Sequence, residues 1–345
     1  MPTVEPDDGL RQDEESLLEK VPFRLSPTNL KGGYAIPEPS LAGDPFVAGP
    51  DELVRSGILW PQPGENDHPS LKKVWARLYS RQQPIKWLTP ELHPQIGKTH
   101  LLRVPARKVT DTSFVGNAWS GVGIRGGGPW TRVFGMWQIP AVTKPAAAQG
   151  LEGGWNSSSW VGIDGFDLDL VSTDVLQGGV QQQVDANGNA SYVAWFEWFA
   201  PPQANSPQYI FQSNVPSLTV SPGDMVFCLV SYFGPLPGIG NMGNVLFFNM
   251  STNAAFAVLL FPPPGATNSG NTIEWIMEAP DGGEPNSSLP EFTPVVFLAA
   301  LGSTRTATNS GNPAIGDTLN IANSSGKVLT SVTAGPALAV IDFIG

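Results

Sequence analysis

Histidine and cysteine are almost missing from this chain of 345 residues. All three histidines precede residue 101, and Cys228 is the single cysteine. Residues 111–345 therefore cannot by themselves form a Ser-His-Asp or Cys-His triad, a histidine-ligated zinc site or a disulfide. If this region is an enzyme, carboxylates and amides must carry its chemistry. The apolar run M-V-F-C-L-V around Cys228 predicts a buried, unreactive thiol.

Basic residues are scarce in the same region. Residues 111–345 contain 5 Lys and Arg against 16 Asp and Glu, so the whole net charge of −11 falls there and the first 110 residues are neutral. This balance excludes the basic surface of a nucleic-acid-binding protein, and we expect no nucleic-acid partner. It suits a protein that works at low pH, although an acidic surface that only keeps the protein in solution explains it equally well.

Long apolar runs are absent too. The chain has no uninterrupted apolar run of about 18 residues, so no membrane span is predicted and we expect no membrane partner. The first ten residues, M-P-T-V-E-P-D-D-G-L, have neither the basic start nor the apolar centre of a secretion signal. No signal peptide is visible in the sequence.

What the chain does have is a change of pattern near residue 110. Residues 1–110 are irregular and punctuated by proline, with helical patterns at 13–20 and 70–80. The second helix is amphipathic and basic, so it could dock on an acidic domain as a pro-segment or inhibitory arm, or be an ordinary surface helix. We predict that residues 1–110 are an N-terminal extension that acid processing could remove.

Residues 111–345 have the pattern of an all-β domain. Short runs rich in β-branched and aromatic residues are interrupted every 8 to 12 residues by Gly, Pro, Asn or Asp. The stretch D-A-N-G-N-A at 185–190 predicts a tight hairpin turn. We predict an antiparallel two-sheet β-sandwich. The expected strands are 132–138, 158–163, 175–184, 191–199, 209–212, 225–233, 245–250, 256–261, 272–278, 294–299 and 327–333.

The run T-I-E-W-I-M-E-A-P at 272–280 places two glutamates four residues apart among apolar side chains. If the run is a strand, Glu274 and Glu278 share one face and Trp275 points to the other. An ionised carboxylate on a mostly buried surface is costly unless it is paired or used. Both glutamates are therefore candidate functional groups.

Two further strands carry polar side chains on one face. Alternation in V-L-Q-G-G-V-Q-Q-Q-V puts Gln177 and Gln181 together, and in S-Y-V-A-W-F-E-W-F it puts Trp195 and Glu197 together. A face furnished with Trp, Gln and Glu suits an extended polymer such as a peptide or a glycan. Aromatic residues as dense as these also occur in ordinary sandwich cores.

Paired glutamates on a sandwich strand are similar to the E-x-D-x-E pattern of sandwich-fold glycoside hydrolases. Here Ile276 stands where that pattern has its central carboxylate. Residues four apart on a regular strand lie roughly 13 Å apart at the backbone, so a bulge would be needed to bring the two carboxyl groups to about 5 Å. A glycoside hydrolase that uses Glu274 and Glu278, and a non-catalytic lectin-like binding module, are the alternatives to a peptidase.

Two other patterns do not indicate a cofactor. G-V-G-I-R-G at 121–126 has the glycine spacing of a dinucleotide-binding loop, but G-G-P-W follows it instead of a helix. The aspartates within 164–174 lack the glycine and the terminal glutamate of an EF-hand, which favours a loop with capping aspartates. We expect no metal and no other cofactor.

Several stretches, in order, resemble one family, the glutamic peptidases, which are also called eqolisins. They are N-A-W-S-G (117–121), V-F-G-M-W-Q-I-P (133–140), S-S-W-V-G-I-D-G (158–165), L-Q-G-G-V (176–180), Y-V-A-W-F-E-W-F (192–199), S-P-G-D (221–224) and E-W-I-M-E (274–278). The resemblance implies an acid endopeptidase on a concanavalin A-like sandwich. It also implies a protein or peptide substrate and a reaction without a metal or a covalent intermediate.

The resemblance assigns roles to individual residues. Gln177 and Glu274 match the catalytic pair, with Glu274 as general base and then acid, and Gln177 orienting the water and stabilising the oxyanion. Glu278 and Glu197 are expected as supporting carboxylates. The positions that line the substrate cleft match Trp119, Gly121, Trp160, Asp164 and Phe196, and Asp164 also supports the base.

The chain departs from the family's pattern at several positions. Gly178 stands where threonine is usual, Ala279 replaces a common acidic residue, the loop after Asp164 is a few residues longer, and the usual cysteines are missing. These departures bear on substrate preference and optimum pH more than on the catalytic pair. The resemblance implies a secreted, extracellular protein, and we expect a monomer.

Overall fold

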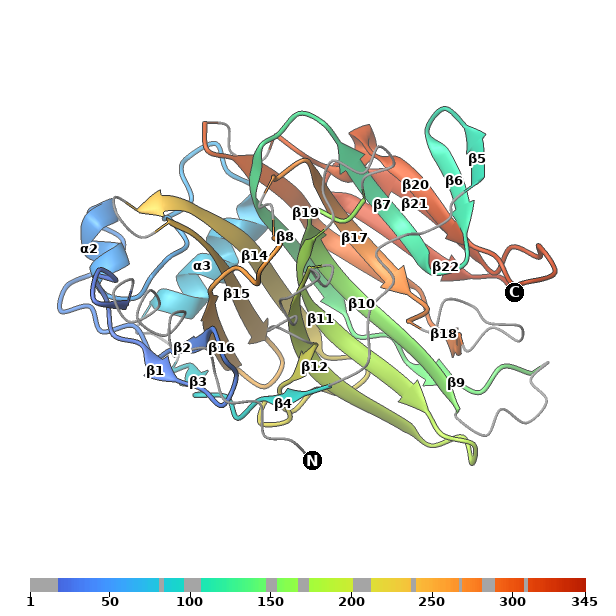
Figure 1. The fold of residues 1–345 in the computed structure, drawn as a ribbon, viewed down its shortest axis with the longest axis horizontal. Helices are drawn as coiled ribbons and strands as arrows, with labels where there is room; N and C mark the ends of the chain where they lie inside the picture. The colour runs from blue at the N-terminus through green and yellow to red at the C-terminus, as the bar shows by residue number, and fades with distance from the viewer. Residues whose placement is uncertain are drawn as a thin grey trace.

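The computed structural model describes residues 18–80, 84–95, 107–146, 154–166, 174–200, 212–236, 240–266, 269–280, 289–306 and 310–345. Two large, mainly antiparallel sheets form a β-sandwich (Figure 1). The predicted two-sheet sandwich is therefore confirmed. Among the described residues, no helix is long and apolar enough to cross a membrane.

The first sheet, named sheet A here, takes strands from both ends of the chain. In spatial order they are β1 (Ser26–Pro27), β2 (Gly33–Ile36), β16 (Ala254–Leu260), β15 (Gly240–Asn249), β14 (Met225–Leu236), β8 (Trp130–Gln138), β19 (Val295–Thr304), β22 (Leu338–Phe343) and β21 (Thr330–Gly335). A short strand, β3 (Lys86–Trp87), pairs with β16 in parallel.

The second sheet, sheet B, carries the candidate site. Its spatial order is β4 (His93–Pro94), β13 (Ser213–Asn214), β12 (Ala190–Phe199), β11 (Val175–Val184), β10 (Trp155–Ile163), β17 (Thr272–Glu278), β7 (Trp119–Arg125), β20 (Asp317–Ile321), β6 (Ser113–Gly116) and β5 (Arg107–Thr110). The smaller elements are the strand pair β9 (Val142–Thr143) and β18 (Glu291–Phe292), the helices α2 (Pro50–Arg55) and α3 (Pro69–Tyr79), and a 3₁₀ helix, η1 (Pro313–Ile315).

Alternation along the strands decides which side chains form the core. In β17, Ile273 and Trp275 point between the sheets and join the main apolar core. The indole N–H of Trp275 donates to the carbonyl oxygen of Phe134 in sheet A, at 2.8 Å. Glu274 and Glu278 consequently lie on the face of sheet B that points away from sheet A, which we call the outer face of sheet B.

The region before residue 110 forms part of both sheets. β1, β2 and β3 extend one edge of sheet A, while β4 pairs with β13 at an edge of sheet B. Helix α3, predicted at 70–80, packs its apolar side against sheet A, where Trp60 also stacks on Phe227 with ring centroids 5.2 Å apart. Removing residues 1–110 would take strands from both sheets and uncover this apolar surface.

Most expected strands are present with boundaries shifted by a few residues, and β11 and β17 begin and end where predicted. The predicted turn at 185–190 joins β11 to β12 and contains Gly188 at a φ of 89°. Cys228 is buried, as predicted. The helix expected at 13–20 and the strand expected at 209–212 lie largely outside the described residues. Of the strands that begin after residue 110, β6, β7, β9, β13, β18, β20 and β22 were not predicted.

Candidate active site

One row of cross-strand neighbours crosses the outer face of sheet B. The register places Gln177 of β11 opposite Glu197 of β12 on one side and opposite Gly162 of β10 on the other. Gly162 lies opposite Glu274 of β17, which in turn lies opposite Gly123 of β7. Because neighbouring strands are about 4.8 Å apart, the backbones of Gln177 and Glu274 are separated by about 10 Å.

Gly162 leaves room between these two polar side chains. A methyl group at position 162 would lie 3.0 Å from Oε1 of Glu274 and 3.4 Å from Cβ of Gln177. It would also lie 2.9 Å from Cζ3 of Trp160. Gln177 and Glu274 therefore border the same space above Gly162, which Trp160 also contacts, and we call this space the volume above Gly162.

The Gln177 amide is held by a buried carboxylate. Its Nε2 donates a hydrogen bond to Oε2 of Glu197 at 3.0 Å, and both side chains are at most 1% exposed. An amide nitrogen has two hydrogens, so one N–H is left for another acceptor. Within the described part of the chain, Oε1 of Gln177 has no hydrogen-bond partner. The amide can thus offer both a donor and an acceptor to the volume above Gly162.

Glu274 is a fully buried carboxyl group. Neither of its oxygens accepts a hydrogen bond from the residues that the structure describes. Burial raises its pKa well above the ordinary value, and the negative charge of Asp164 raises it further. A carboxyl group with free oxygens and an elevated pKa is suited to take up and release a proton.

Asp164 ends β10 in the left-handed backbone region, at a φ of 68°. Its carboxylate accepts four hydrogen bonds, from Ser269 Oγ (2.7 Å), the Gly270 N–H (2.9 Å), the Asn271 N–H (2.8 Å) and the Tyr232 hydroxyl (3.1 Å). Burial raises the pKa of Asp164, and the bonds from Ser269 and the backbone only partly oppose that rise. The predicted cleft residue Asp164 is therefore fixed in place beside the candidate base.

Aromatic side chains cover the outer face next to Glu274. Trp119 and Trp160 make a T-shaped contact with ring centroids 5.0 Å apart, and Nε1 of Trp160 donates to Oε2 of Glu278 at 2.8 Å. Gly121 of β7 lies opposite Ile276 of β17 in the same region. The structure thus brings the expected cleft residues Trp119, Gly121 and Trp160 to the same face as the catalytic candidates.

Phe196 is the exception among the expected cleft residues. It points into the core between the sheets, where its ring lies 6.3 Å from that of Phe256. Alternation explains this placement, because Glu197 on the outer face of β12 requires its neighbour to point inward. The expectation that Phe196 lines the cleft is corrected accordingly.

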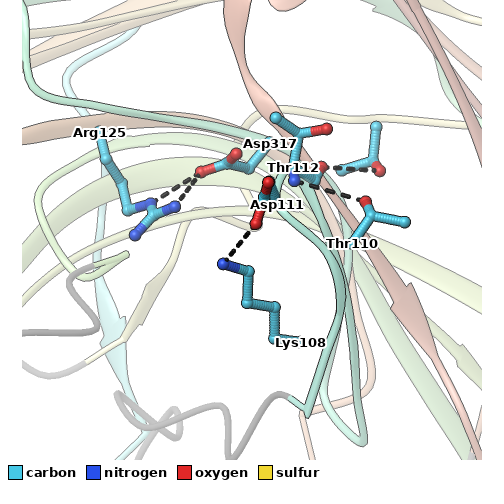
Figure 2. Close-up of polar contacts among 7 residues, drawn as sticks. Lys108, Thr110, Asp111, Thr112, Arg125 and Asp317 are labelled. Carbon is cyan, nitrogen blue, oxygen red and sulfur yellow. Dashed lines mark hydrogen bonds and ion pairs between the residues drawn. The ribbon is translucent and has the colours of Figure 1, made fainter.

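The far end of the row carries a paired charge. Asp317 of β20 lies opposite Gly123, and its Oδ2 accepts from the Arg125 guanidinium at 2.7 Å. Figure 2 shows this pair beside the exposed pair of Lys108 and Asp111, whose charged atoms are 2.8 Å apart. The charge of Asp317 is therefore balanced by a cation, whereas the Glu274 oxygens have no such partner among the described residues.

The two glutamates of β17 do not form a close pair. β17 keeps a regular register with β10 and with β7 along its whole length. The bulge that a glycoside hydrolase pair would need is therefore not present in this strand, and Glu278 is engaged with Trp160 instead. Among the described residues, no group of three or more His, Cys, Asp or Glu side chains is arranged to hold a metal ion.

Tyr232 belongs to this site but was not predicted from the sequence. It lies on β14 of sheet A and reaches across the sandwich to Asp164. Asp174, at the start of β11, is nearby and accepts a hydrogen bond from Nε1 of Trp198 at 3.1 Å. Local alternation identifies which face a residue occupies within its own sheet, and it carries no signal for a contact made from the opposite sheet.

Comparisons with known proteins place these residues in context. A model of the peptidase A4 family matches residues 117–341. The crystal structure of scytalido-glutamic peptidase with a transition state analog inhibitor is 17% identical and has a TM-score of 0.51, covering 66% of this chain and 98% of that chain. The structure of SCP-B, a member of the eqolisin family, with the tripeptide Ala-Ile-His is 18% identical with a TM-score of 0.49, over 66% of this chain and 98% of that one.

Aspergilloglutamic peptidase from Aspergillus niger is 25% identical with a TM-score of 0.43, and the match covers 55% of this chain and 99% of that chain. No curated protein matches this sequence. The family model covers more than half of the chain, and the likeness to the first of these structures supports the sandwich fold.

Proposed function

Because this chain belongs to the peptidase A4 family, the glutamic peptidases, we propose that it is an acid-active endopeptidase with Gln177 and Glu274 as its catalytic pair. The observation that carries the proposal is the cross-strand row in which Gly162 separates the two side chains. Their free polar atoms border one volume, and Trp119 and Trp160 supply an aromatic wall for an extended peptide.

The proposed reaction uses two proton transfers on Glu274. Ionised Glu274 takes a proton from a water molecule, and the water oxygen attacks the carbonyl carbon of the scissile bond. The amide of Gln177 accepts from that water through Oε1 and donates its second N–H to the developing oxyanion. When the C–N bond breaks, Glu274 returns its proton to the leaving amine. No covalent intermediate and no metal-bound water are required.

Glu197 supports Gln177 in this scheme. Its carboxylate accepts one N–H of the amide, so the remaining N–H and the oxygen keep a fixed orientation toward the volume above Gly162. A charged acceptor also makes this hydrogen bond stronger than one between neutral groups. This hydrogen bond also offsets part of the cost of burying Glu197.

Two effects bound the expected pH range. The acid limit follows the pKa of Glu274, because the base must be ionised, and burial moves that limit upward from the ordinary glutamate value. The alkaline limit follows from Asp164, whose buried negative charge repels that of Glu274 once both carboxyl groups are ionised.

The test is cleavage of a denatured protein by Glu274→Gln and Gln177→Ala between pH 3 and 7. We expect each variant to lose at least about 1,000-fold in kcat/KM, since each removes a group that acts in the transition state. Gln183→Ala is the matched control, because Gln183 lies on the same strand face six residues along and should leave the rate unchanged. Retained proteolysis in either site variant, with unchanged circular dichroism, would overturn the assignment of the pair.

A further inference from the structure

Tyr232 is a residue of sheet A whose hydroxyl reaches the carboxylate of Asp164, next to the end of β10 in sheet B. It is 7% exposed and lies on β14. Its hydroxyl donates to Oδ2 of Asp164 at 3.1 Å and lies 3.5 Å from the carbonyl oxygen of Ile163. Its ring packs on Trp198 with centroids 5.6 Å apart, and Trp198 in turn donates to Asp174. The Tyr232 hydroxyl is therefore held at the Asp164 carboxylate, with its ring packed against Trp198.

Asp164 connects this tyrosine to the candidate base. The backbone N–H of Asp164 donates to the carbonyl oxygen of Thr272 at 2.9 Å, which places Asp164 two residues from Glu274 along β17. The negative charge of Asp164 acts on Glu274, and the charges of Asp164, Asp174 and Glu274 all act on Tyr232. The four groups therefore form one electrostatic unit within the sandwich.

We propose that Tyr232 is a positioning residue for the peptidase reaction: its hydroxyl holds the Asp164 carboxylate and so sets how readily Glu274 takes up and releases its proton. The inference rests on the proposed role of Glu274 as the base. Tyr232 itself touches neither the volume above Gly162 nor, on the described contacts, the catalytic amide. It acts through Asp164.

The direction of its effect follows from the hydrogen bond. A donor to a carboxylate favours the charged form, so Tyr232 keeps Asp164 ionised to lower pH than burial alone would allow. Without the hydroxyl, Asp164 takes up a proton more readily and repels the Glu274 charge less. The pKa of Glu274 then falls, and the acid limit of activity moves to lower pH.

The ionisable groups that make up this electrostatic unit come from four elements. They are Asp164 at the end of β10, Asp174 at the start of β11, Glu274 on β17 and Tyr232 on β14. Ser269, Gly270 and Asn271, the other residues that contact Asp164, are not ionisable. Arg125, on β7, is already paired with Asp317 and does not compensate Asp164.

The experiment compares the pH profile of kcat/KM for wild type, Tyr232→Phe and Tyr192→Phe. Tyr192, on β12 of sheet B, is the matched control, because its hydroxyl accepts from the Val142 N–H of β9, away from Asp164. We expect Tyr232→Phe to move the acid limb down by about half a pH unit with a nearly unchanged plateau, and Tyr192→Phe to move nothing. An unmoved limb in Tyr232→Phe, or a limb moved upward, overturns the proposal.

A readout that does not depend on activity separates this proposal from the proposed function. The side-chain carboxyl of Glu274 can be titrated by carbon-13 NMR in wild type, Tyr232→Phe, Asp164→Asn and the double variant. We expect a lower midpoint in each single variant and no further shift in the double variant, because Tyr232 acts through Asp164. Additive shifts overturn the route through Asp164. If the protein titrates as expected but cleaves no peptide, the peptidase role fails and the coupling stands.

Discussion

At position 162 the site depends on the absence of a side chain. Gly162 lies between the two members of the pair, and an added methyl group would come within 3.0 Å of the Glu274 carboxyl oxygen. We expect Gly162→Ala to lower kcat/KM by about 100-fold or more, because reacting groups misplaced by a fraction of an ångström lose much of their effective concentration. The measurement is peptide cleavage at the optimum pH of the wild type.

The control for this substitution is Gly49→Ala. Gly49 precedes α2 with a φ of −72°, and a methyl group there meets no atom within 4 Å. Full activity in Gly162→Ala would mean that substrate and water do not use the volume between Gln177 and Glu274.

Strand alternation in the sequence predicted the face of the strand on which a site residue lies. The strand pattern of 272–278 placed Glu274 on one face, and that of 175–184 placed Gln177 on one face, which is how both strands are built. The family resemblance then added Phe196 to the cleft, although alternation from Glu197 already turned it inward. Tyr232 was out of reach, because its contact depends on the stacking of two sheets.

At the scale of elements, α3 acts as a third layer on sheet A. Trp75 is 1% exposed, its indole N–H donates to the carbonyl oxygen of Trp60 at 3.1 Å, and its ring contacts Tyr79. We expect Trp75→Ala to lower the free energy of unfolding by about 3–5 kcal/mol, as for other large buried side chains. Urea denaturation in the Glu274→Gln background, which prevents self-digestion, measures this change.

Lys73→Ala is the companion variant, because Lys73 lies on the exposed side of the same helix and should change stability by less than about 0.5 kcal/mol. If Trp75→Ala were equally silent, the helix would be a loosely attached arm, as a removable inhibitory segment requires. A large loss would make the described N-terminal region part of the folded enzyme.

Strand prediction missed β7, where glycine replaces β-branched and aromatic residues. β7, W-S-G-V-G-I-R, carries Gly121 and Gly123 on its outer face. A methyl group at 121 would come 2.0 Å from the carbonyl oxygen of Trp275, and one at 123 would come 2.2 Å from the ring of Phe166. These glycines are required by close packing with β17 and with the loop after β10, and the sequence alone shows them only as strand-breaking residues.

For the whole molecule, the buried carboxyl groups make stability depend on pH. The folded-state pKa values of Glu274 and Asp164 are raised, so the folded chain binds more protons than the unfolded chain between the ordinary values and the raised ones. The free energy of unfolding therefore falls as pH rises through that window. The net charge of −11 at pH 7 adds to this destabilisation.

We expect the thermal midpoint to be higher near pH 4 than near pH 7, measured by circular dichroism in the Gln177→Ala background, in which the proposed catalytic pair is incomplete. Adding Glu274→Gln removes one group whose pKa is raised, so the stability should depend less on pH. The change in the free energy of unfolding between the two pH values should shrink by about 1.4 kcal/mol for each unit by which the pKa of Glu274 is raised. A midpoint that rises steadily toward neutral pH would contradict the raised pKa values of Glu274 and Asp164.

The order of strands in sheet B also has a consequence for the time at which activity arises. Glu274 pairs with Gly162, 112 positions earlier, and Asp317 pairs with Gly123, 194 positions earlier. Contacts between such distant segments form slowly, because closing the long intervening loop costs conformational entropy before the contacts stabilise it. A chain emerging from the ribosome therefore lacks the proposed Gln177–Glu274 pair until synthesis has passed β17, and sheet B gains its β20 neighbour only about 40 residues later.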